Sequence, residues 1–198
     1  DLLARFEATR SIYLKNGSPL GVEAHFVQSD HADTLERIAA NGPDELYGGE
    51  TGARICDDVS RNGGYLTLED LTQYRAIVHD RPLQTNYRDL TVSAVPGPCA
   101  GPTVVEILNI LNAFDLRAMS TVDSLHTLVE AVKLAAVDRF TYMGDPAIYG
   151  FPCDILAHPD YGQSRATCID PAAATDFEAG DPWPFSDVDR PADFPAPA

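Results

Sequence analysis

The segment from Ser124 to Pro146 constrains the fold more than any other part of this sequence. It reads SLHTLVEAVKLAAVDRFTYMGDP. Apolar side chains recur through it at helical spacing, so one face of a long helix must be buried against a larger body. The helix also carries Glu130, Lys133, Asp138 and Arg139, and the Gly-Asp-Pro at its end is a helix stop.

The sequence leaves two interpretations of these charges open. In the first, pairs one turn apart, such as Glu130 with Lys133, lie on a partly solvated flank, where each stabilises the helix by about 0.2–0.5 kcal/mol. In the second, Asp138 and Arg139 tie the helix to a neighbouring element through charge-assisted hydrogen bonds. Neither interpretation makes this helix a catalytic site.

Composition excludes several classes of function. The chain has 198 residues, 44% of them apolar and 22% charged, which is typical of a soluble globular protein with enough residues for one domain with a real core. Its formal charge of -16 creates a field that repels phosphate backbones and anionic lipid, so we expect no nucleic-acid partner and no membrane association. No apolar run approaches the roughly 18 residues of a membrane span, and the first ten residues lack a signal-peptide pattern.

Cysteine and histidine spacing does not predict a metal site. No two of the four cysteines form a CxxC pair, so we expect small buried residues or unpaired thiols, although three disulfide pairings would be possible if all four were bridged. The histidines show no HExxH or similar ligand spacing. The residues concerned are Cys56, Cys99, Cys153, Cys168, His25, His31, His79, His126 and His158.

Three helices are predicted in the first part of the chain. The first runs from Asp33 and ends at Asn41-Gly42-Pro43, because an Asn-Gly pair followed by proline terminates helices. The second covers about Gly52 to Ser60. The third begins at Thr67, which with Asp70 three residues later forms a capping box.

Two strands and two longer helices are predicted next. Tyr74 to His79 and Leu83 to Val95 read as strands, which we expect to form a ribbon bent at Arg81-Pro82. Residues 103–114 and 122–142 are predicted to form a helical hairpin joined by a short loop.

A rigid turn of small residues, Pro96 to Pro102, precedes the first helix of that hairpin. Its glycines suggest a phosphate-binding loop, but neither the GxxxxGK[ST] nor the GxGxxG spacing is present. A turn that lets the backbone pack closely is the better interpretation. After Cys168 the chain becomes rich in proline and acidic residues, so we expect most of residues 171–198 to be an extended or mobile tail, with Trp183 as its anchor to the body.

The ordered set of motifs resembles the γ-glutamyltranspeptidases and their acylase relatives. Five stretches carry the resemblance over about Asp30 to Asp170. They are HADTLERIAANGPDELYGGE (31–50), NGGYLTLEDLTQYRAI (62–77), Pro82 with TNYRDLTV (85–92), PGPCAGPTVVEILNILNAFDL (96–116) and LHTLVEAVKLAAVDRFTYMGDP (125–146).

This resemblance implies an α+β fold. The family has a four-layer αββα N-terminal-nucleophile hydrolase fold, of which this chain supplies a mostly helical part with a short β-ribbon. Members cut themselves immediately before a threonine or serine, whose freed amino group then acts as the base for its own hydroxyl in attacking an amide. The family needs no metal or organic cofactor.

The resemblance also implies what this chain lacks. None of its thirteen threonines lies in a Thr-Thr-His type of start motif, so we expect the nucleophile on a separate chain. Residues 1–170 resemble the C-terminal portion of the large subunit, and residues 171–198 a tail that leads to the processing site. The expected partners are the small subunit with the nucleophile, the N-terminal part of the large subunit and a small acidic amide substrate.

We carry over no catalytic residue, and no substrate-binding residue is identified. Glu130, Asp138 and Arg139 are instead expected to form an internal polar tie, and Asp145-Pro146 a helix stop and turn. The turn PGPCAGP at Pro96 to Pro102 differs from the PPPSSGG of typical γ-glutamyltranspeptidases, and GVEAHFVQSDHADTL lacks the family's usual Gly-Asp step. These departures suggest a divergent branch, for which a glutaryl, oxalyl or other short acidic amide competes with γ-glutamyl transfer.

Two other functions remain open. The first is a processing-dead relative that serves as an inert structural or binding subunit. The second is an independent helical domain that binds a partner through its acidic tail, which predicts that these residues fold alone. The compartment is not predicted either, because the family resemblance allows a periplasmic, secreted or cytoplasmic protein.

Overall fold

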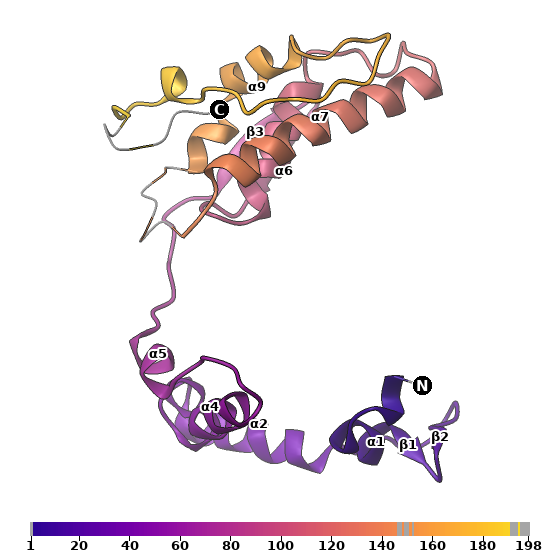
Figure 1. The fold of residues 1–198 in the computed structure, drawn as a ribbon, viewed down its shortest axis with the longest axis vertical. Coiled ribbons are helices and arrows are strands. Elements are labelled where there is room, and N and C mark those ends of the chain that lie inside the picture. The colour runs from indigo at the N-terminus through magenta and orange to yellow at the C-terminus, as the bar shows by residue number, and fades with distance from the viewer. Residues whose placement is uncertain (1, 146–147, 149–150, 152, 191–193, 195–198) are drawn as a thin grey trace. The chain divides into compact units, whose positions relative to one another are not determined.

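The computed structural model describes residues 2–145, 148, 151, 153–190 and 194. The chain divides into two compact units, Asp1–Ile77 (unit 1) and Val78–Ala198 (unit 2) (Figure 1). In the described part of each unit, helices dominate and one two-stranded antiparallel ribbon accompanies them. No helix in these ranges is long and apolar enough to cross a membrane.

Unit 1 begins with a short helical turn, a helix and a small ribbon, which are followed by four further helices. The elements are η1 (Leu2–Ala4), α1 (Glu7–Tyr13), β1 (Leu14–Lys15), β2 (Ser18–Pro19), α2 (Ser29–Asn41), α3 (Asp44–Tyr47), α4 (Glu50–Arg61) and α5 (Leu68–Gln73). The three helices predicted here are present, and α2 begins four residues earlier than expected.

The helix end and the helix start predicted in unit 1, at Gly42 and Thr67, are confirmed. Gly42 has φ 73°, a conformation that favours glycine, and its amide donates to the Ile38 carbonyl at 2.8 Å to close α2. The capping box of α5 is complete. Thr67 Oγ1 accepts from the Asp70 amide at 3.2 Å, and Asp70 Oδ2 accepts from the Thr67 amide at 2.8 Å.

Unit 2 contains the ribbon, the two longer helices and a C-terminal set of short elements. They are β3 (Leu83–Tyr87), β4 (Leu90–Ala94), α6 (Ala100–Leu111), α7 (Thr121–Tyr142), η2 (Cys153–Ala157), α9 (Pro159–Ala166) and η3 (Trp183–Phe185). The predicted hairpin of two helices is confirmed as α6 and α7, which pack against each other.

The prediction of a strand from Tyr74 to His79 was wrong. That segment has no regular structure, and the ribbon forms instead within the second predicted strand, where Leu83 pairs with Ala94. The chain reverses at Arg88, which has φ 57° and leads into Asp89. A tight turn at these polar residues divides the alternating segment into two strands, so it pairs with itself.

Helix α6 lies at the centre of unit 2, in contact with α7, α9, η2 and both strands of the ribbon. Two glycines permit close backbone approach around it. A Cβ on Gly101 would lie 1.9 Å from the Val95 carbonyl oxygen, which confirms the close-packing interpretation of the Pro96–Pro102 turn. A Cβ on Gly162 would lie 2.4 Å from Asn109 Cβ, so α9 contacts α6 with no side chain between them.

The core of unit 2 consists of two clusters of buried side chains. One contains Tyr142, Phe151, Cys153, Ile155, Leu156, Tyr161 and Trp183, and the other contains Ile110, Leu111, Ala131, Leu134, Ala166 and Ile169. Trp183 therefore anchors the C-terminal segment, as predicted, with its ring edge-on to Phe151 at 5.5 Å between centroids. All four cysteines are unpaired, and Cys56 and Cys153 are buried.

Candidate functional site

A fully buried carboxylate, Asp138 on α7, is the centre of a polar network in unit 2. Its oxygens accept hydrogen bonds from Tyr161 Oη at 2.6 Å, Arg165 Nη2 at 3.2 Å and the Gly180 amide at 2.8 Å. Arg165 Nε also lies 2.9 Å from Asp138 Oδ2, which makes a buried ion pair. One carboxylate thus joins α7, α9 and the segment that follows α9.

Glu106 on α6 is also fully buried and borders this network. Burial, and after it the neighbouring Asp138 carboxylate, raise the pKa of Glu106 well above its ordinary value. The raised pKa favours the protonated form of Glu106, in which its carboxyl can donate a hydrogen bond to Asp138. In the described part of the chain no other donor reaches either of its oxygens, which fits the neutral form.

A second contact of this kind lies about two helical turns before Asp138. Glu130 accepts from Lys133 Nζ at 2.8 Å and from the Thr175 amide at 3.0 Å, while Lys133 Nζ also donates to the Thr175 carbonyl. Burial alone would raise the pKa of Glu130, but these hydrogen bonds outweigh it and lower the pKa below its ordinary value. The Lys133 ammonium also lies 5.1 Å from the centre of the Phe177 ring.

These contacts hold residues 171–185, called the strap below, along α7 (Figure 1). Two further bonds reach it. Arg165 Nη2 donates to the Glu178 carbonyl at 2.9 Å, and Tyr142 Oη donates to the Gly180 carbonyl at 2.5 Å. Burial and the nearby carboxylates raise the pKa of Tyr142 to about 12, so its hydroxyl keeps the proton that it donates. Space is tight here, because a Cβ on Gly180 would lie 2.5 Å from Tyr161 Oη.

Arg139 connects α7 to the start of α6. Its Nη1 donates to the Cys99 carbonyl at 2.7 Å and to Thr103 Oγ1 at 3.2 Å. The interpretation of Asp138 and Arg139 as ties to neighbouring elements is therefore confirmed, and Glu130 joins them as predicted. Helix α7 ends at Tyr142, before the predicted stop, whose Pro146 lies outside the described residues.

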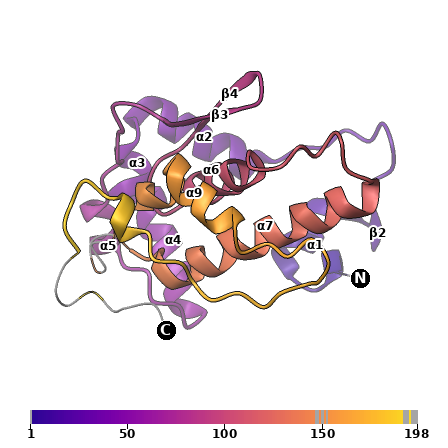
Figure 2. The same ribbon diagram turned by 90° about the horizontal axis from the view of Figure 1, so that it is seen from above.

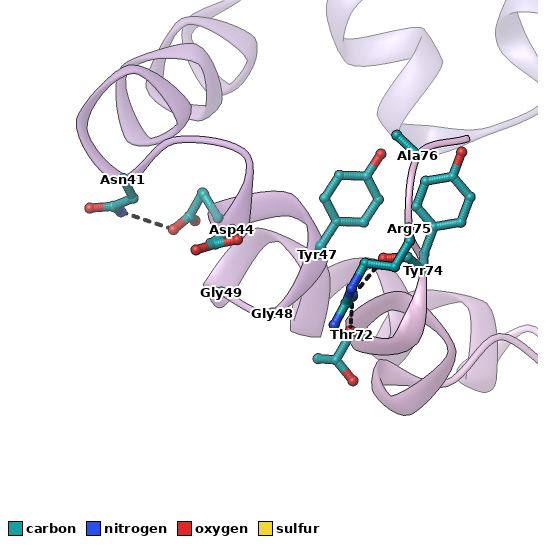
Figure 3. Close-up of a pocket in the computed structure, with 10 residues that line it drawn as sticks. Asn41, Asp44, Tyr47, Gly48, Gly49, Thr72, Tyr74, Arg75 and Ala76 are labelled. Carbon is teal, nitrogen blue, oxygen red and sulfur yellow. Dashed lines mark hydrogen bonds between the residues drawn. The ribbon is translucent and has the colours of Figure 1, made fainter. Parts of the chain in front are cut away.

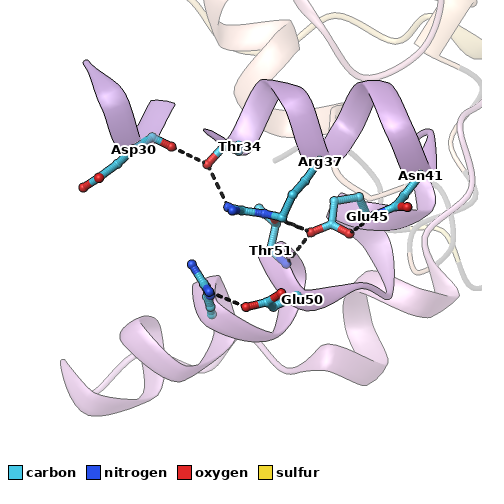
Figure 4. Close-up of polar contacts among 8 residues, drawn as sticks. Asp30, Thr34, Arg37, Asn41, Glu45, Glu50 and Thr51 are labelled. Atoms are coloured by element: carbon cyan, nitrogen blue, oxygen red, sulfur yellow. Dashed lines mark hydrogen bonds and ion pairs between the residues drawn. The ribbon is translucent and has the colours of Figure 1, made fainter. Parts of the chain in front are cut away.

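Unit 1 has its own buried carboxylate, Glu45 at the start of α3 (Figure 4). It accepts from Thr51 Oγ1 at 2.8 Å, from the Thr51 amide at 3.1 Å and from Asn41 Nδ2 at 2.9 Å, and Arg37 Nε lies 3.4 Å away. The hydrogen bonds from Thr51 and Asn41 lower the pKa of Glu45. This contact clasps α2, α3 and α4 together.

A pocket of about 690 Å³ lies beside this clasp (Figure 3). The rings of Tyr47 and Tyr74 stack at one end of it, with centroids 5.3 Å apart. Arg75 Nη1 is turned back to the Thr72 and Tyr74 carbonyls, both at 2.7 Å. The lining residues are Asn41, Asp44, Glu45, Tyr47, Gly48, Gly49, Thr72, Tyr74, Arg75 and Ala76.

The pocket lining offers no nucleophile with an adjacent base. Thr72 carries the one hydroxyl of Ser/Thr type in the lining, and it donates to the Glu69 carbonyl at 3.0 Å. In the described ranges no group of three His, Cys, Asp or Glu side chains could hold a metal ion. These contacts organise a scaffold, and the expectation that this chain carries no catalytic residue stays a prediction.

Sequence reasoning missed Glu106, Glu45 and the partners Tyr161 and Arg165. Glu106 interrupts an apolar run one turn from Pro102 and Asn109, and this placement of an acid on a buried face was a usable signal. The Asp138 partners lie 23 and 27 residues away along the chain. No spacing pattern within a few residues predicts hydrogen bonds between side chains so far apart in the sequence.

Comparisons with known proteins show which family this chain belongs to. The family model described as Gamma-glutamyltranspeptidase matches residues 1–192. The glutathione hydrolase proenzyme of Escherichia coli (strain K12) is 38% identical over 173 residues, which cover 86% of this chain and 30% of that protein. The Acylase ACY 1 proenzyme of Pseudomonas sp. (strain SE83) is 35% identical over 181 residues, which cover 90% of this chain and 32% of that protein.

Structural comparison leads to the same group. A crystal structure of Helicobacter pylori gamma-glutamyltranspeptidase matches with a TM-score of 0.75 and 29% sequence identity, over 87% of this chain and 50% of that one. The chain thus spans about a third of the length of the two proenzymes named above. The predicted α+β class, as part of the N-terminal-nucleophile hydrolase fold, is confirmed. With a matching model along nearly its whole length and a scaffold of the same fold, this chain belongs to the γ-glutamyltranspeptidase family.

Proposed function

We propose that this chain is a noncatalytic part of the large subunit of a self-processed amide hydrolase or acyltransferase. Its nucleophile, an N-terminal Thr or Ser, lies on a separate polypeptide. The freed amino group of that residue takes the proton of its own hydroxyl, the hydroxyl oxygen attacks the substrate carbonyl, and an acyl-enzyme forms with release of the amine. Water or an acceptor amine then removes the acyl group.

One observation carries this proposal. The family model matches residues 1–192 of this chain. The match to the Escherichia coli proenzyme covers 86% of this chain but only 30% of that proenzyme. The charged residues at the centre of unit 2 support the scaffold part of the proposal, because Glu130, Asp138 and Arg165 are all engaged in ties between elements. A catalytic carboxylate or guanidinium would instead be directed towards a substrate.

The proposed substrate class rests on the reactions that the relatives' names describe. Glutathione contains a γ-glutamyl amide, and an acylase hydrolyses an amide of a carboxylic acid. We therefore propose γ-glutamyl or related small acidic acyl amides as substrates. Residues 1–170 would serve as scaffold, and the tail from 171 onwards would lead to the processing site.

The test is intact-mass analysis and N-terminal sequencing of every polypeptide that copurifies with this chain under denaturing conditions. We expect a companion that begins with Thr or Ser. The purified complex should release p-nitroaniline from γ-glutamyl- or glutaryl-p-nitroanilide, whereas the isolated chain should not. A chain that purifies alone, or a companion with another N-terminal residue, would favour the inert structural subunit.

A further inference from the structure

Cys99 and Cys153 lie in neighbouring parts of unit 2. Cys99 precedes α6 as its N-cap residue, and Cys153 is the first residue of η2, which packs against α6. The amide of Gly97, two residues before Cys99, donates to Asp154 Oδ1 at 3.3 Å. Because Asp154 directly follows Cys153, this hydrogen bond ties the segment that carries one cysteine to the segment that carries the other.

The end of α7 connects the two cysteines a second time. Helix α7 packs against α6 (Figure 2), and Arg139 Nη1 donates to the Cys99 carbonyl at 2.7 Å. The same nitrogen lies 3.5 Å from Met143 Sδ, and Met143 packs against the buried cluster that contains Cys153. Two independent sets of contacts therefore bring these cysteines together, although they are far apart in the sequence.

Both thiols are free and only weakly held. Cys99 Sγ donates to the Val95 carbonyl at 3.2 Å, and Cys153 Sγ donates to the Phe151 carbonyl at 3.7 Å. A thiol is a weak hydrogen-bond donor, so either bond can be given up when the side chain rotates. The electrostatics agree with the contacts. Burial raises the pKa of Cys153, and the nearby Asp154 carboxylate and Cys99 thiol raise it further.

We propose that Cys99 and Cys153 form a site of reversible covalent modification, at which a small-molecule disulfide oxidises them to a bond with each other. The bond would tie the start of α6 to η2. A disulfide joins residues whose Cα atoms lie about 4.4–6.8 Å apart. Both cysteines lie in short segments, a turn and a 3₁₀ helix, that can adjust to this separation while α6 and α7 stay intact. The inference is independent of the proposed function, because it uses residues of unit 2 alone.

The reaction consists of two thiol–disulfide exchanges. Cys99 is only partly buried, so its thiolate attacks one sulfur of the reagent. A new S–S bond forms, the S–S bond of the reagent breaks, and the released thiolate takes up the proton that Cys99 gave up. The Cys153 thiolate then attacks the Cys99 sulfur and displaces the second half of the reagent, which takes up the Cys153 proton. Two protein thiols are oxidised to one disulfide, and the reagent is reduced to two thiols.

The test incubates the protein, as it purifies, with oxidised glutathione under native conditions. All samples carry Cys168→Ser, because Cys168 is exposed and would bind glutathione by itself. Free thiols are then alkylated in denaturant, and the protein is digested without reductant and mapped by mass spectrometry. We expect one linked pair of peptides, Cys99 with Cys153, and a loss of two hydrogen atoms from the intact mass. Cys56, which is buried in unit 1, should stay reduced and become alkylated.

Two results of this mapping would overturn the inference. One is the absence of the linked pair, and the other is a Cys99 that keeps its glutathione while Cys153 stays reduced. The mapping needs no substitution of either cysteine in the pair. It therefore remains decisive even where a variant of the pair fails to fold.

Variants in the same background separate the two exchanges. Cys153→Ala should trap glutathione on Cys99, because no second thiol displaces it. Cys99→Ala should leave Cys153 reduced, because Cys153 is buried. Cys56→Ala, which also removes a buried thiol, is the matched control and should leave the Cys99–Cys153 link unchanged. Oxidation of Cys153 in the Cys99→Ala variant, at the rate seen when Cys99 is present, would contradict the pairing.

The stability of unit 2 gives a second readout. Oxidation should raise the midpoint of its thermal unfolding, because the link restricts the unfolded chain between the two cysteines. Trp183 fluorescence follows the transition. The rise should vanish in Cys153→Ala and persist in Cys56→Ala. An equal or lower midpoint for the oxidised protein would show that folded unit 2 does not accommodate the bond, and would overturn the inference.

Discussion

Tyr161 Oη donates a hydrogen bond to Asp138 Oδ2 at 2.6 Å. The two residues are 23 positions apart, both side chains are buried, and their contact joins α9 to α7. Arg165, one turn further along α9, supplies the positive charge that balances the same carboxylate. Tyr161 therefore ties α9 to α7 through a hydrogen bond, and Arg165 compensates the charge of the Asp138 carboxylate. Four predictions follow from this network and the strap that it holds.

Asp138→Asn should lower the free energy of unfolding of unit 2 by about 3 kcal/mol, because it leaves the Arg165 guanidinium buried without its counter-charge. Denaturation in urea, followed by the fluorescence of Trp183, measures this, since Trp183 is the one tryptophan and lies in the unit 2 core. Asp187→Asn, an exposed acid-to-amide change, should shift the result by less than about 0.5 kcal/mol. Equal effects of the two substitutions would contradict the role given to Asp138.

Glu106→Gln should reduce the loss of stability that accompanies a rise in pH above about 4.5. The folded-state pKa of Glu106 is raised above the ordinary 4.5, so its contribution is fully present below about pH 4.5 and is lost as pH rises through the folded pKa. Within that window one bound proton changes stability by up to about 1.4 kcal/mol per pH unit. Glutamine keeps a neutral donor beside Asp138.

The measurement is the free energy of unfolding from pH 5 to 9 for both proteins. We expect a flatter profile for Glu106→Gln, with Glu178→Gln, an exposed carboxyl on the strap, following the wild-type curve. Parallel curves for wild type and Glu106→Gln would show that Glu106 is ionised in the folded chain.

Gly180→Ala should destabilise the strap by about 1–3 kcal/mol, because the new Cβ would lie 2.5 Å from Tyr161 Oη and 2.8 Å from Arg165 Cδ. The same substitution should cost less in a Tyr161→Phe background, where the hydroxyl is absent. A double-mutant cycle on thermal unfolding tests this coupling. Additive effects would mean that Gly180 and Tyr161 are not in contact.

Glu130→Gln should loosen the strap around Thr175 while α7 stays folded. The substitution removes the negative charge that holds both Lys133 and the Thr175 amide. Hydrogen exchange of a peptide containing Thr175 should become at least several-fold faster, whereas Asp176→Asn, an exposed change on the same strap, should leave it unchanged. Because the pKa of Glu130 is lowered by folding, the wild-type strap should also loosen as pH falls through that lowered pKa.

Local rules predicted the elements whose causes lie within a few residues. Thr67 with Asp70, and Gly42 after Asn41, specify helix ends through backbone geometry, so the sequence was sufficient. The α6 and α7 hairpin followed from apolar periodicity. Tyr74 to His79 was misjudged because β-branched and aromatic residues are enriched in strands, whereas the adjacent segment instead pairs with itself about Arg88.

The polar network was predictable in part. Glu130, Asp138 and Arg139 were singled out because charges on an apolar helix need partners, and each has one. Which partners they have depends on the packing of α9 and of the strap, which no local pattern encodes. Glu106 was missed because a single acid in an apolar helix also fits a solvated position, so its placement one turn from Pro102 and Asn109 was a signal of burial but did not decide it.

The hydrogen bonds that hold the strap to α7 and α9 are made with its own main chain. Glu130, Lys133, Arg165, Asp138 and Tyr142 contact the amides or carbonyls of Thr175, Glu178 and Gly180. The path of the strap is therefore determined by side chains of α7 and α9. The amide and carbonyl groups that these side chains bind are present in nearly every amino acid. Exposed positions of the strap can therefore exchange their side chains while the strap follows the same path, whereas Phe177, Gly180, Pro182 and Trp183 make packing contacts of their own.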